Sequence, residues 1–265
     1  MTDTTKTVIV TGAYGAIGKA IAEGLARKGF HVTLVGRDLH HLQKACESIQ
    51  QRTSNPDIHY EAVDLGRQAE IAEFSRRWKG PLHVLVNNAA TGPRKRTETP
   101  EGIEMQWAVN VMGYVWMMNC FIPFMEGLPD ARIVNVASYW AGGLDLWDPE
   151  FKTRPYDNDA AYRQSKQANR MLTLAYAERL KPKGITVNAC HPGDVNSKLS
   201  NYFGFGGHES PEQGAATPLY LALSEEVKGV TGKYYEHLQQ LSCPFMKNRD
   251  AVERLFSYCS GLAGS

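Results

Sequence analysis

Thr11-Gly-Ala-Tyr-Gly-Ala-Ile-Gly18 directly follows the apolar, β-branched residues 7–11 and precedes a helix-period segment that includes Ile21 and Leu25. Glycines in this position let the backbone turn tightly and approach a pyrophosphate, whose charge the N–H groups at the helix start can stabilise. Turns before helices are also commonly glycine-rich for steric reasons alone, so the pattern needs support from its surroundings. The residues expected to line this candidate phosphate site are Gly12, Tyr14, Gly15, Ala16, Ile17 and Gly18.

Outward from this turn, short apolar runs alternate with segments long enough to form helices. The runs expected to form strands are residues 7–11, 31–35, 58–62, 82–86, 132–136 and 185–189, and Tyr234 with Tyr235 is expected to close a seventh. Strands separated by helices are not joined as hairpins, so they form a parallel sheet with right-handed crossovers. We therefore expect a single α/β domain over all 265 residues, a doubly wound parallel sheet of about seven strands with helices on both faces. Ligands of such a sheet bind at the carboxyl ends of its strands.

Charge and cysteine content exclude several classes of protein. Lys+Arg 29 and Asp+Glu 28 are scattered and give a formal net charge of +1, so no surface for nucleic acid is predicted. The five cysteines lie far apart without a CxxC pair, which is typical of free thiols in a reducing compartment. The polar segment 1–6 passes directly into the first strand and lacks the apolar core of a secretion signal. We expect a cytoplasmic protein without a membrane anchor.

Residues 108–125 carry no charged side chain and approach the length of a membrane span. They also contain Asn110, Asn119 and Pro123, which are unfavourable in lipid. The segment is therefore predicted to be a helix buried by its own sheet or by a second subunit. Such a helix would suit a subunit contact, so a homodimer or homotetramer is expected.

The end of the second strand indicates which dinucleotide the glycine turn would hold. NAD-selective sites place a carboxylate there to bind the ribose 2′-hydroxyl, whereas here Gly36 and Arg37 follow Val35. The guanidinium of Arg37 favours a 2′-phosphate through charge-assisted hydrogen bonds, so NADP(H) is expected in preference to NAD(H). Asp38 has two interpretations: an N-cap of the following helix, which we favour, or a ribose ligand.

Tyr162 and Lys166 lie four residues apart near the start of a long helical segment, and this spacing puts the phenol and the ammonium group on one face. A free tyrosine has a pKa of about 10, so it needs a nearby cation before it can act as a general acid–base near neutral pH. Lys166 can supply that charge and also reach a nicotinamide ribose. The alternative is a solvated helix face on which the two residues occur incidentally.

Several motifs on successive strand ends carry a resemblance to a known family. They are Asn87-Asn-Ala-Ala90, Asn110, Ile133-Val-Asn-Val-Ala-Ser138, Tyr162-x-x-x-Lys166 and His191-Pro-Gly193. Together they resemble the short-chain dehydrogenases/reductases over nearly the whole chain, which implies a single Rossmann-fold domain. Within that family the chain is most similar to the retinol dehydrogenase-like and WW-domain oxidoreductase-like branch, through Tyr162-Arg-Gln-Ser-Lys-Gln-Ala-Asn169, Val195-Asn-Ser-Lys-Leu199 and Gly232-Lys-Tyr-Tyr235.

The resemblance implies a role for each matching residue. Ser138 would hydrogen-bond the substrate oxygen and Tyr162 would donate or accept the proton. Lys166 and Asn110 would complete a catalytic tetrad, with Asn110 supporting a water. The implied cofactor contacts, besides Tyr162 and Lys166, are Asp64 and Leu65 at the adenine, Asn87 and Ala89 at the floor, and Pro192, Gly193, Val195 and Ser197 at the nicotinamide. This is the set of an NADP(H)-dependent oxidoreductase that interconverts a small-molecule alcohol and a carbonyl compound.

Two other functions stay open. Gly12, Gly15 and Gly18 also fit the Thr-Gly-x-x-Gly-x-x-Gly spacing of extended sugar-nucleotide epimerases and dehydratases, and Ala16 stands where the common dehydrogenase pattern has glycine. The chain length, the double asparagine and the His-Pro-Gly motif favour the dehydrogenase. A non-enzymatic, NADP-sensing module is the third hypothesis, and the intact catalytic residues argue against it.

Two long irregular stretches, residues 142–159 and 197–211, are expected to overhang the nicotinamide. Glycines in the second stretch permit a mobile lid. His40, His41 and His208 lack a second ligand cluster, so no metal site is predicted. Aromatic residues also pack loops down, but those in and near the two stretches favour an apolar or aromatic substrate: Tyr139, Trp140, Trp147, Phe151, Tyr202, Phe203 and Phe205.

Overall fold

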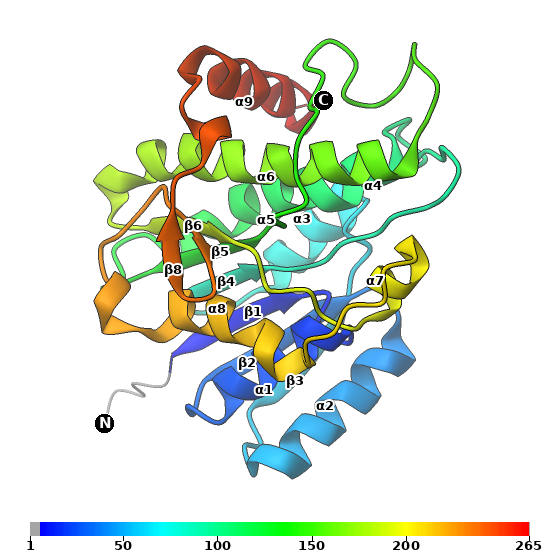
Figure 1. Ribbon diagram of the computed structural model, residues 1–265. Helices are drawn as coiled ribbons and strands as arrows, with labels where there is room; N and C mark the ends of the chain where they lie inside the picture. Colours follow the sequence, from blue (N-terminus) through cyan, green and yellow to red (C-terminus); the bar gives the residue numbers. More distant parts are fainter. Residues whose placement is uncertain (1–5, 265) are drawn as a thin grey trace.

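The computed structural model describes residues 6–264, so residues 1–5 of the polar N-terminal segment lie outside the described part of the chain. An eight-stranded sheet forms the centre of the molecule (Figure 1). Its order is β3-β2-β1-β4-β5-β6-β7-β8, with every neighbouring pair parallel except β7 and β8. The predicted doubly wound α/β fold is confirmed. The strands are β1 (Thr7–Thr11), β2 (His31–Gly36), β3 (Ile58–Ala62), β4 (Val84–Asn87), β5 (Arg132–Val136), β6 (Thr186–Cys190), β7 (Tyr234–Glu236) and β8 (Gln239–Leu241).

The seven predicted strands are all present, and the eighth is an addition that the sequence did not indicate. β8 has three exposed residues and pairs antiparallel with β7 through a turn in which His237 and Leu238 have φ values of 47° and 66°. Hairpin turns with positive φ usually contain glycine or asparagine, and this turn contains neither. The turn carries no signal and the strand has one apolar residue, Leu241, so its sequence contains no alternation from which a strand could be predicted.

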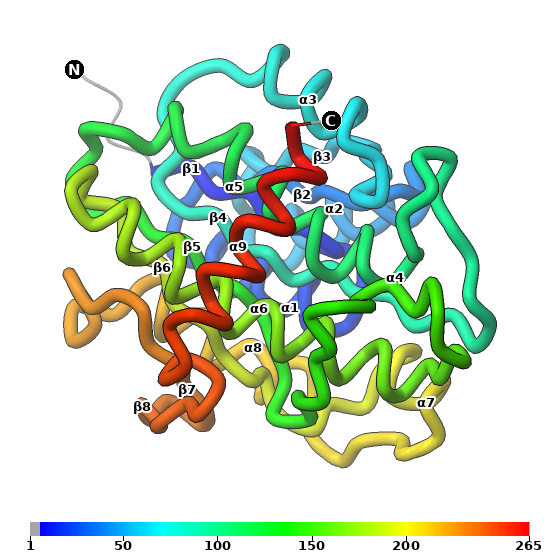
Figure 2. The backbone as a smooth tube through the Cα atoms, turned by 90° about the horizontal axis from the view of Figure 1, so that it is seen from above, coloured from blue at the N-terminus to red at the C-terminus, as the bar shows by residue number. Residues whose placement is uncertain are grey.

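Helices cover both faces of the sheet. α1, α2 and α8 lie on one face, and α3, α5 and α6 lie on the other (Figure 1). α9 packs across α5 and α6 as an outer layer (Figure 2). None of the helices within residues 6–264 has the length and apolar character needed to cross a membrane. The helices are α1 (Ala16–Ala26), α2 (Leu39–Thr53), α3 (Gln68–Arg77), α4 (Met105–Trp107), α5 (Gly113–Phe121), α6 (Asn158–Leu180), α7 (Lys198–Phe203), α8 (Pro211–Leu223) and α9 (Arg249–Ala263).

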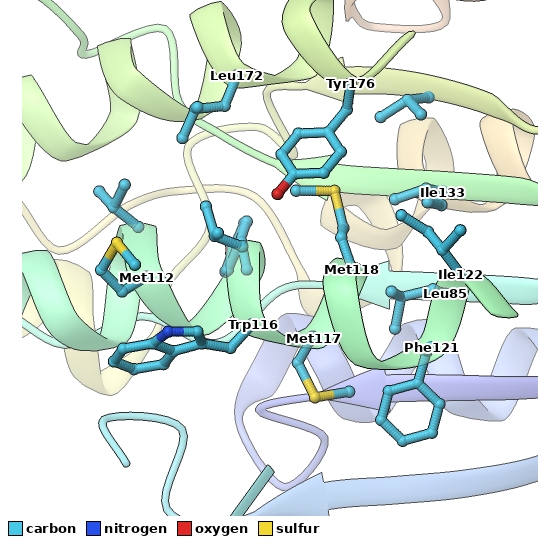
Figure 3. Packing of buried hydrophobic residues seen from close by; sticks show 14 of the residues in the cluster. Leu85, Met112, Trp116, Met117, Met118, Phe121, Ile122, Ile133, Leu172 and Tyr176 are labelled. Atoms are coloured by element: carbon cyan, nitrogen blue, oxygen red, sulfur yellow. The ribbon is translucent and has the colours of Figure 1, made fainter. Parts of the chain in front are cut away.

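The uncharged residues 108–125 form a series of helical turns and not the single regular helix that we expected. A π-helical turn, Ala108–Met112, leads into α5, and a 3-10 turn, Ile122–Phe124, follows it. Trp116, Met118 and Phe121 are all buried. Met118 points toward Tyr176 of α6, whereas Trp116 and Phe121 lie on the side of α5 away from α6 (Figure 3), where Phe121 packs against Phe74 and Trp78. The chain itself covers the segment, so the lack of charge is explained within one subunit. An oligomer stays a prediction, now without this segment as its basis.

The register of the sheet brings the informative loops together. β1 pairs with β4 through Val10 and Val86, and the next strands continue the alignment at the same edge. From β1 the chain proceeds toward β2 and β3, whereas β4 starts the other half of the sheet. The loops therefore part between β1 and β4, which is where ligands bind in such folds.

We expect Phe121→Ala to lower the free energy of unfolding by about 3–5 kcal/mol, because removal of the aromatic ring would leave a cavity in the core. The ring packs against Phe74, Trp78 and Phe124 with centroid distances of 5.0, 5.8 and 5.9 Å. Urea denaturation measures the change. Trp147→Ala, at a side chain that is 85% exposed, is the control and should stay within about 0.5 kcal/mol of wild type. A similarly small loss for Phe121→Ala would contradict the packing described here.

Candidate active site

α6 carries Tyr162 and Lys166 over the carboxyl end of β5. Asp157 caps this helix by accepting a hydrogen bond from the Ala160 N–H at 2.7 Å. The Lys166 Nζ donates to the carbonyl oxygen of Val136, the last residue of β5, at 3.1 Å. It also lies 5.5 Å from the centroid of the Tyr162 ring. The structure thus brings the tyrosine and the lysine together on one face of the helix.

Burial changes the acidity of both groups. Lys166 is 1% exposed, and this burial lowers the pKa of its ammonium group to about 7. Burial also raises the pKa of the Tyr162 phenol well above its ordinary value. At neutral pH the site therefore holds a protonated phenol beside an amine that changes charge close to that pH.

Tyr114 contacts Lys166 and shares its hydrogen-bond acceptor. Reasoning from sequence did not identify this residue. Its hydroxyl donates to the same Val136 carbonyl oxygen at 3.1 Å, and the Lys166 Nζ lies 5.7 Å from its ring centroid. The side chain is fully buried, on α5. The available signal was a tyrosine in an uncharged segment, because a buried phenol needs a hydrogen-bond partner.

Ser138 is the second residue after β5 and is 8% exposed. Its Oγ accepts a hydrogen bond from the Trp140 N–H at 3.0 Å, which fixes the oxygen and leaves the hydroxyl proton available to a ligand. Its backbone carbonyl accepts a hydrogen bond from Arg170. Ser138 and the Lys166 amine are therefore positioned by the same strand end.

Asn110 lies in the π-helical turn, a rare geometry that is frequent at functional sites. Its Oδ1 accepts from the Thr91 N–H at 2.8 Å. Its Nδ2 donates to the Thr91 carbonyl at 3.0 Å and to the Ser165 Oγ at 3.2 Å. The amide is thus used to hold the loop after β4 against α6.

The glycine turn forms a cradle that larger residues would fill. Gly12 has a φ of +64°, and a Cβ there would lie 2.8 Å from the Ala89 Cα. A Cβ on Gly18 would collide with the carbonyl oxygen of Gly12. Gly15 is the N-cap of α1 and has no side chain to cap it, so the N–H groups of the first turn remain for a ligand. These features fit the pyrophosphate of a dinucleotide.

Asn88 ties this cradle to the loop after β4, a role that we did not predict. Its Nδ2 donates to the Thr11 carbonyl at 2.9 Å, and its N–H donates to the Thr11 Oγ1 at 2.8 Å. The predicted floor residue Asn87 is fully buried and donates to the Asn135 Oδ1 at 3.0 Å, so its amide lies within the sheet. Ala89 packs beneath the glycine turn.

Arg37 is exposed at the end of β2 and has no hydrogen bond or ion pair with any residue from 6 to 264. Asp38 is the N-cap of α2, as we favoured: its carboxylate accepts from the His41 N–H at 2.9 Å. That backbone hydrogen bond and the His41 side chain lower the pKa of the Asp38 carboxyl group. The carboxylate is therefore occupied by the helix, and the guanidinium is free.

Asp64 and Leu65, the predicted adenine contacts, follow β3. The Asp64 Oδ1 accepts from the Gly66 N–H at 2.9 Å and closes a local turn. Leu65 is buried, and its side chain belongs to the hydrophobic core. The local turn thus explains the hydrogen bonding of the Asp64 carboxylate, and packing in the core explains the burial of the Leu65 side chain.

The loop after β6 contains Pro192, Gly193, Val195 and Ser197. Gly193 has a φ of +108°, and a Cβ there would collide with the Glu209 carboxylate. Val195 forms an isolated bridge with Glu209, and the Ser197 Oγ accepts from the Ser200 N–H at 3.1 Å as part of a capping box on α7. Glu209, which we did not single out, thus lines this loop.

Aromatic rings lie beside Tyr162. The Phe203 ring at the end of α7 lies 4.9 Å from that of Tyr162, and a Cβ on Gly92 would collide with it. Trp140 lies 5.9 Å from Tyr162 and 5.2 Å from Phe205 between ring centroids. Phe203 and Phe205 of the stretch 197–211 therefore join Trp140, from the loop after β5, in an aromatic cluster beside the Tyr162 ring.

The other long stretch, residues 142–159, is held by two buried carboxylates. The Glu150 carboxylate accepts from the Glu104 N–H at 3.0 Å and from the Tyr258 hydroxyl at 2.5 Å, which ties the stretch to α4 and α9. Burial alone would raise the pKa of Asp148, but hydrogen bonds from three backbone N–H groups and a threonine hydroxyl lower it to about 2. The stretch is thus anchored at its middle.

Comparison with known proteins identifies the family. The family model described as short chain dehydrogenase matches residues 6–204. Retinol dehydrogenase 13 of Mus musculus is 34% identical over 280 residues, which cover 98% of this chain and 84% of that protein. A structure of an uncharacterized protein from Mycobacterium paratuberculosis has a TM-score of 0.82 at 25% identity and covers 98% of this chain and 94% of its own. L-sorbose reductase from Gluconobacter frateurii, solved with NADPH and L-sorbose, has a TM-score of 0.69 at 25% identity, with coverages of 87% and 94%.

The matched segment contains the glycine turn, Asn110, Ser138 and the Tyr162–Lys166 pair. These are the residues that the fold gathers at the carboxyl ends of β1, β4 and β5. Sequence, fold and site therefore agree that this chain belongs to the short-chain dehydrogenase family, in its retinol dehydrogenase-like branch.

Proposed function

We propose that the protein is an NADP(H)-dependent oxidoreductase that interconverts an alcohol and a carbonyl compound. The observation that carries this proposal is the Tyr162 phenol beside the buried Lys166 amine, at the strand end that also carries Ser138. Enzymes of this family use nicotinamide cofactors, and the cradle of Gly12 and Gly18 fits such a dinucleotide. When bound, the nicotinamide supplies or accepts the hydride.

Tyr162 would exchange the proton that accompanies the hydride. Its pKa is raised in the free enzyme, so the phenol holds its proton at neutral pH and can give it to a carbonyl oxygen. Lys166, with its pKa of about 7, can take up a proton from solvent as the phenol gives its own proton to the substrate, and the resulting ammonium group stabilises the phenolate. Proton transfer therefore needs no large change in the net charge of the buried pair.

Ser138 and Asn110 would place the remaining groups. The Ser138 hydroxyl can donate to the substrate oxygen and stabilise developing negative charge there. Both N–H groups of the Asn110 side chain are engaged and its Oδ1 accepts one hydrogen bond, so a water in a proton relay would be held by the backbone of Asn110 or by the second lone pair of Oδ1. Asn110 in this proposal fixes the loop and the helix between which that water lies.

Arg37 would select the cofactor. Its guanidinium is exposed and has no partner among the described residues at the strand end where a ribose 2′-phosphate would lie, whereas Asp38 is engaged as a helix cap. L-sorbose reductase, whose structure contains NADPH, supports the same choice. The cluster of Trp140, Phe203 and Phe205 beside Tyr162 favours an apolar or aromatic substrate.

Tyr162→Phe should abolish reduction of aldehydes by NADPH with little effect on NADPH affinity, because it removes the acid and leaves the dinucleotide site intact. Steady-state kinetics and calorimetric titration measure the two effects. Tyr220→Phe, at a hydroxyl bonded to Glu226 on the surface, is the matched control and should keep full activity. Substantial turnover by Tyr162→Phe would sink the assigned role.

Arg37→Ala should weaken NADPH binding roughly tenfold or more and leave NADH binding unchanged, because a charge-assisted hydrogen bond to a phosphate contributes about 1.5–3 kcal/mol. Calorimetric titration of both cofactors into wild type and variant measures this. Arg76→Ala, at an exposed arginine on α3, is the control and should bind both as wild type does. If neither cofactor binds wild type, the whole proposal is wrong.

Lys166→Met should change how stability depends on pH. The folded pKa of Lys166 is about 7 against an ordinary 10.5, so between these values the unfolded chain binds the extra proton. The unfavourable burial is complete below pH 7 and is relieved as the pH rises toward 10.5. Stability of wild type relative to Lys166→Met should therefore increase between about pH 6.5 and about pH 9.5 in urea denaturation.

The control for this measurement is Lys228→Met, at an exposed ion pair with Glu225. Its difference from wild type should be nearly the same at both pH values. A constant difference for Lys166→Met as well would mean that its folded pKa is not lowered.

A further inference from the structure

A buried arginine outside the catalytic tetrad holds the backbone of Ser138. Arg170 lies on α6, one turn beyond Lys166, and is 5% exposed. Its Nη2 donates to the carbonyl oxygen of Ser138 and to the hydroxyl of Tyr234, the latter at 2.6 Å. We propose that Arg170 is a positioning residue that fixes Ser138 for its contact with the substrate oxygen. This inference rests on the proposed function, because it takes the role of Ser138 from there.

Two residues of β7 hold the guanidinium in place. Tyr234 and Glu236 lie two positions apart and so point to the same side of this strand. The Arg170 Cζ lies 3.6 Å from the Tyr234 ring centroid, and its Nη2 lies 3.9 Å from the Glu236 Oε1. The Tyr234 hydroxyl donates to the same Oε1 at 2.6 Å. Stacking and charge therefore fix the plane of the guanidinium before it meets Ser138.

The contact lies where regular pairing of β5 stops. The Ala137 N–H still donates to the Cys190 carbonyl at 2.8 Å, and the strand pairing of β5 with β6 ends at Val136. Two peptides further on, the peptide between Ser138 and Tyr139 has its carbonyl held by Arg170. Because the orientation of this peptide sets the direction of the Ser138 Cα–Cβ bond, the arginine replaces the missing strand partner and aims the hydroxyl.

Stability alone does not explain a buried arginine here. Buried ion pairs contribute little to folding compared with apolar residues of similar volume. The Arg170 Nε is buried without a hydrogen-bond partner in the described chain, which is unfavourable. A methionine could pack against Tyr234 and Phe245 without this cost. An apolar side chain cannot reproduce the polar contacts with Tyr234, Glu236 and Ser138, and of these the hydrogen bond to Ser138 reaches the candidate site.

The test compares Arg170→Met and Arg170→Lys with Arg179→Met as the matched control. Arg179 lies on the same helix, with its Cζ 3.7 Å from the Phe256 ring centroid and an ion pair to Glu253 at 2.6 Å, and none of its contacts involves Ser138. With NADPH and benzaldehyde or octanal, Arg170→Met should lower kcat about tenfold to hundredfold, as misplacement of a reacting group does, with an unchanged KM for NADPH. Arg170→Lys should recover part of kcat, and Arg179→Met should match wild type.

Hydrogen exchange gives a readout that needs no turnover. The backbone amides of Trp140 and Ala141 should exchange roughly tenfold faster or more in Arg170→Met and at the wild-type rate in Arg179→Met. If wild type reduces no carbonyl compound, the proposed function fails while this measurement still tests the contact. If Arg170→Met does not fold, Tyr234→Phe should give a smaller loss of kcat in the same direction. Wild-type kcat in Arg170→Met, or unchanged exchange of these amides, would overturn the proposal.

Discussion

The hydrogen bond from the Lys166 Nζ to the Val136 carbonyl oxygen, 3.1 Å long, organises the candidate active site. It joins α6 to β5, and Tyr114 adds α5 by donating to the same oxygen. An amine buried this deeply loses much of its hydration, which is why its pKa falls toward 7. The surrounding core of α5, α6 and the sheet keeps it there (Figure 3). The position of Tyr162 is then set by the α6 turn that it shares with Lys166, and the position of Ser138 is set by the end of β5.

Much of the fold could be predicted from the sequence because strands buried on both faces are nearly continuous β-branched runs, as in residues 8–10 and 132–136. β8 has no such run. The π-helical turn around Asn110 was also invisible, since its apolar residues resemble those of a regular buried helix. A π-helical turn lengthens the hydrogen-bond spacing of a regular helix by one residue, and over five residues this does not change the sequence pattern detectably.

The candidate site likewise contains residues that the sequence could predict and residues that it could not. Tyr162 and Lys166 could be paired because both lie on one helix and their spacing decides the shared face. Asn88 and Arg170 could not be assigned, since Asn88 holds the distant Thr11 and Arg170 contacts residues 32 and 64 positions away. Such contacts exist only once the sheet order has brought separate segments together. The proposed NADP(H) preference rests on a single exposed side chain, Arg37, and therefore on chemistry more than on fold.

The two outer strands of the sheet also determine how the protein behaves at high concentration. β8 offers three residues beyond a tight turn, too few to template a neighbouring chain. At the other edge, β3 carries the exposed His59 and Tyr60, and its Glu61 pairs with Arg77 at 2.8 Å. A foreign strand would have to strip water from charged groups to join this edge. Both edges therefore disfavour the addition of a strand from a second molecule.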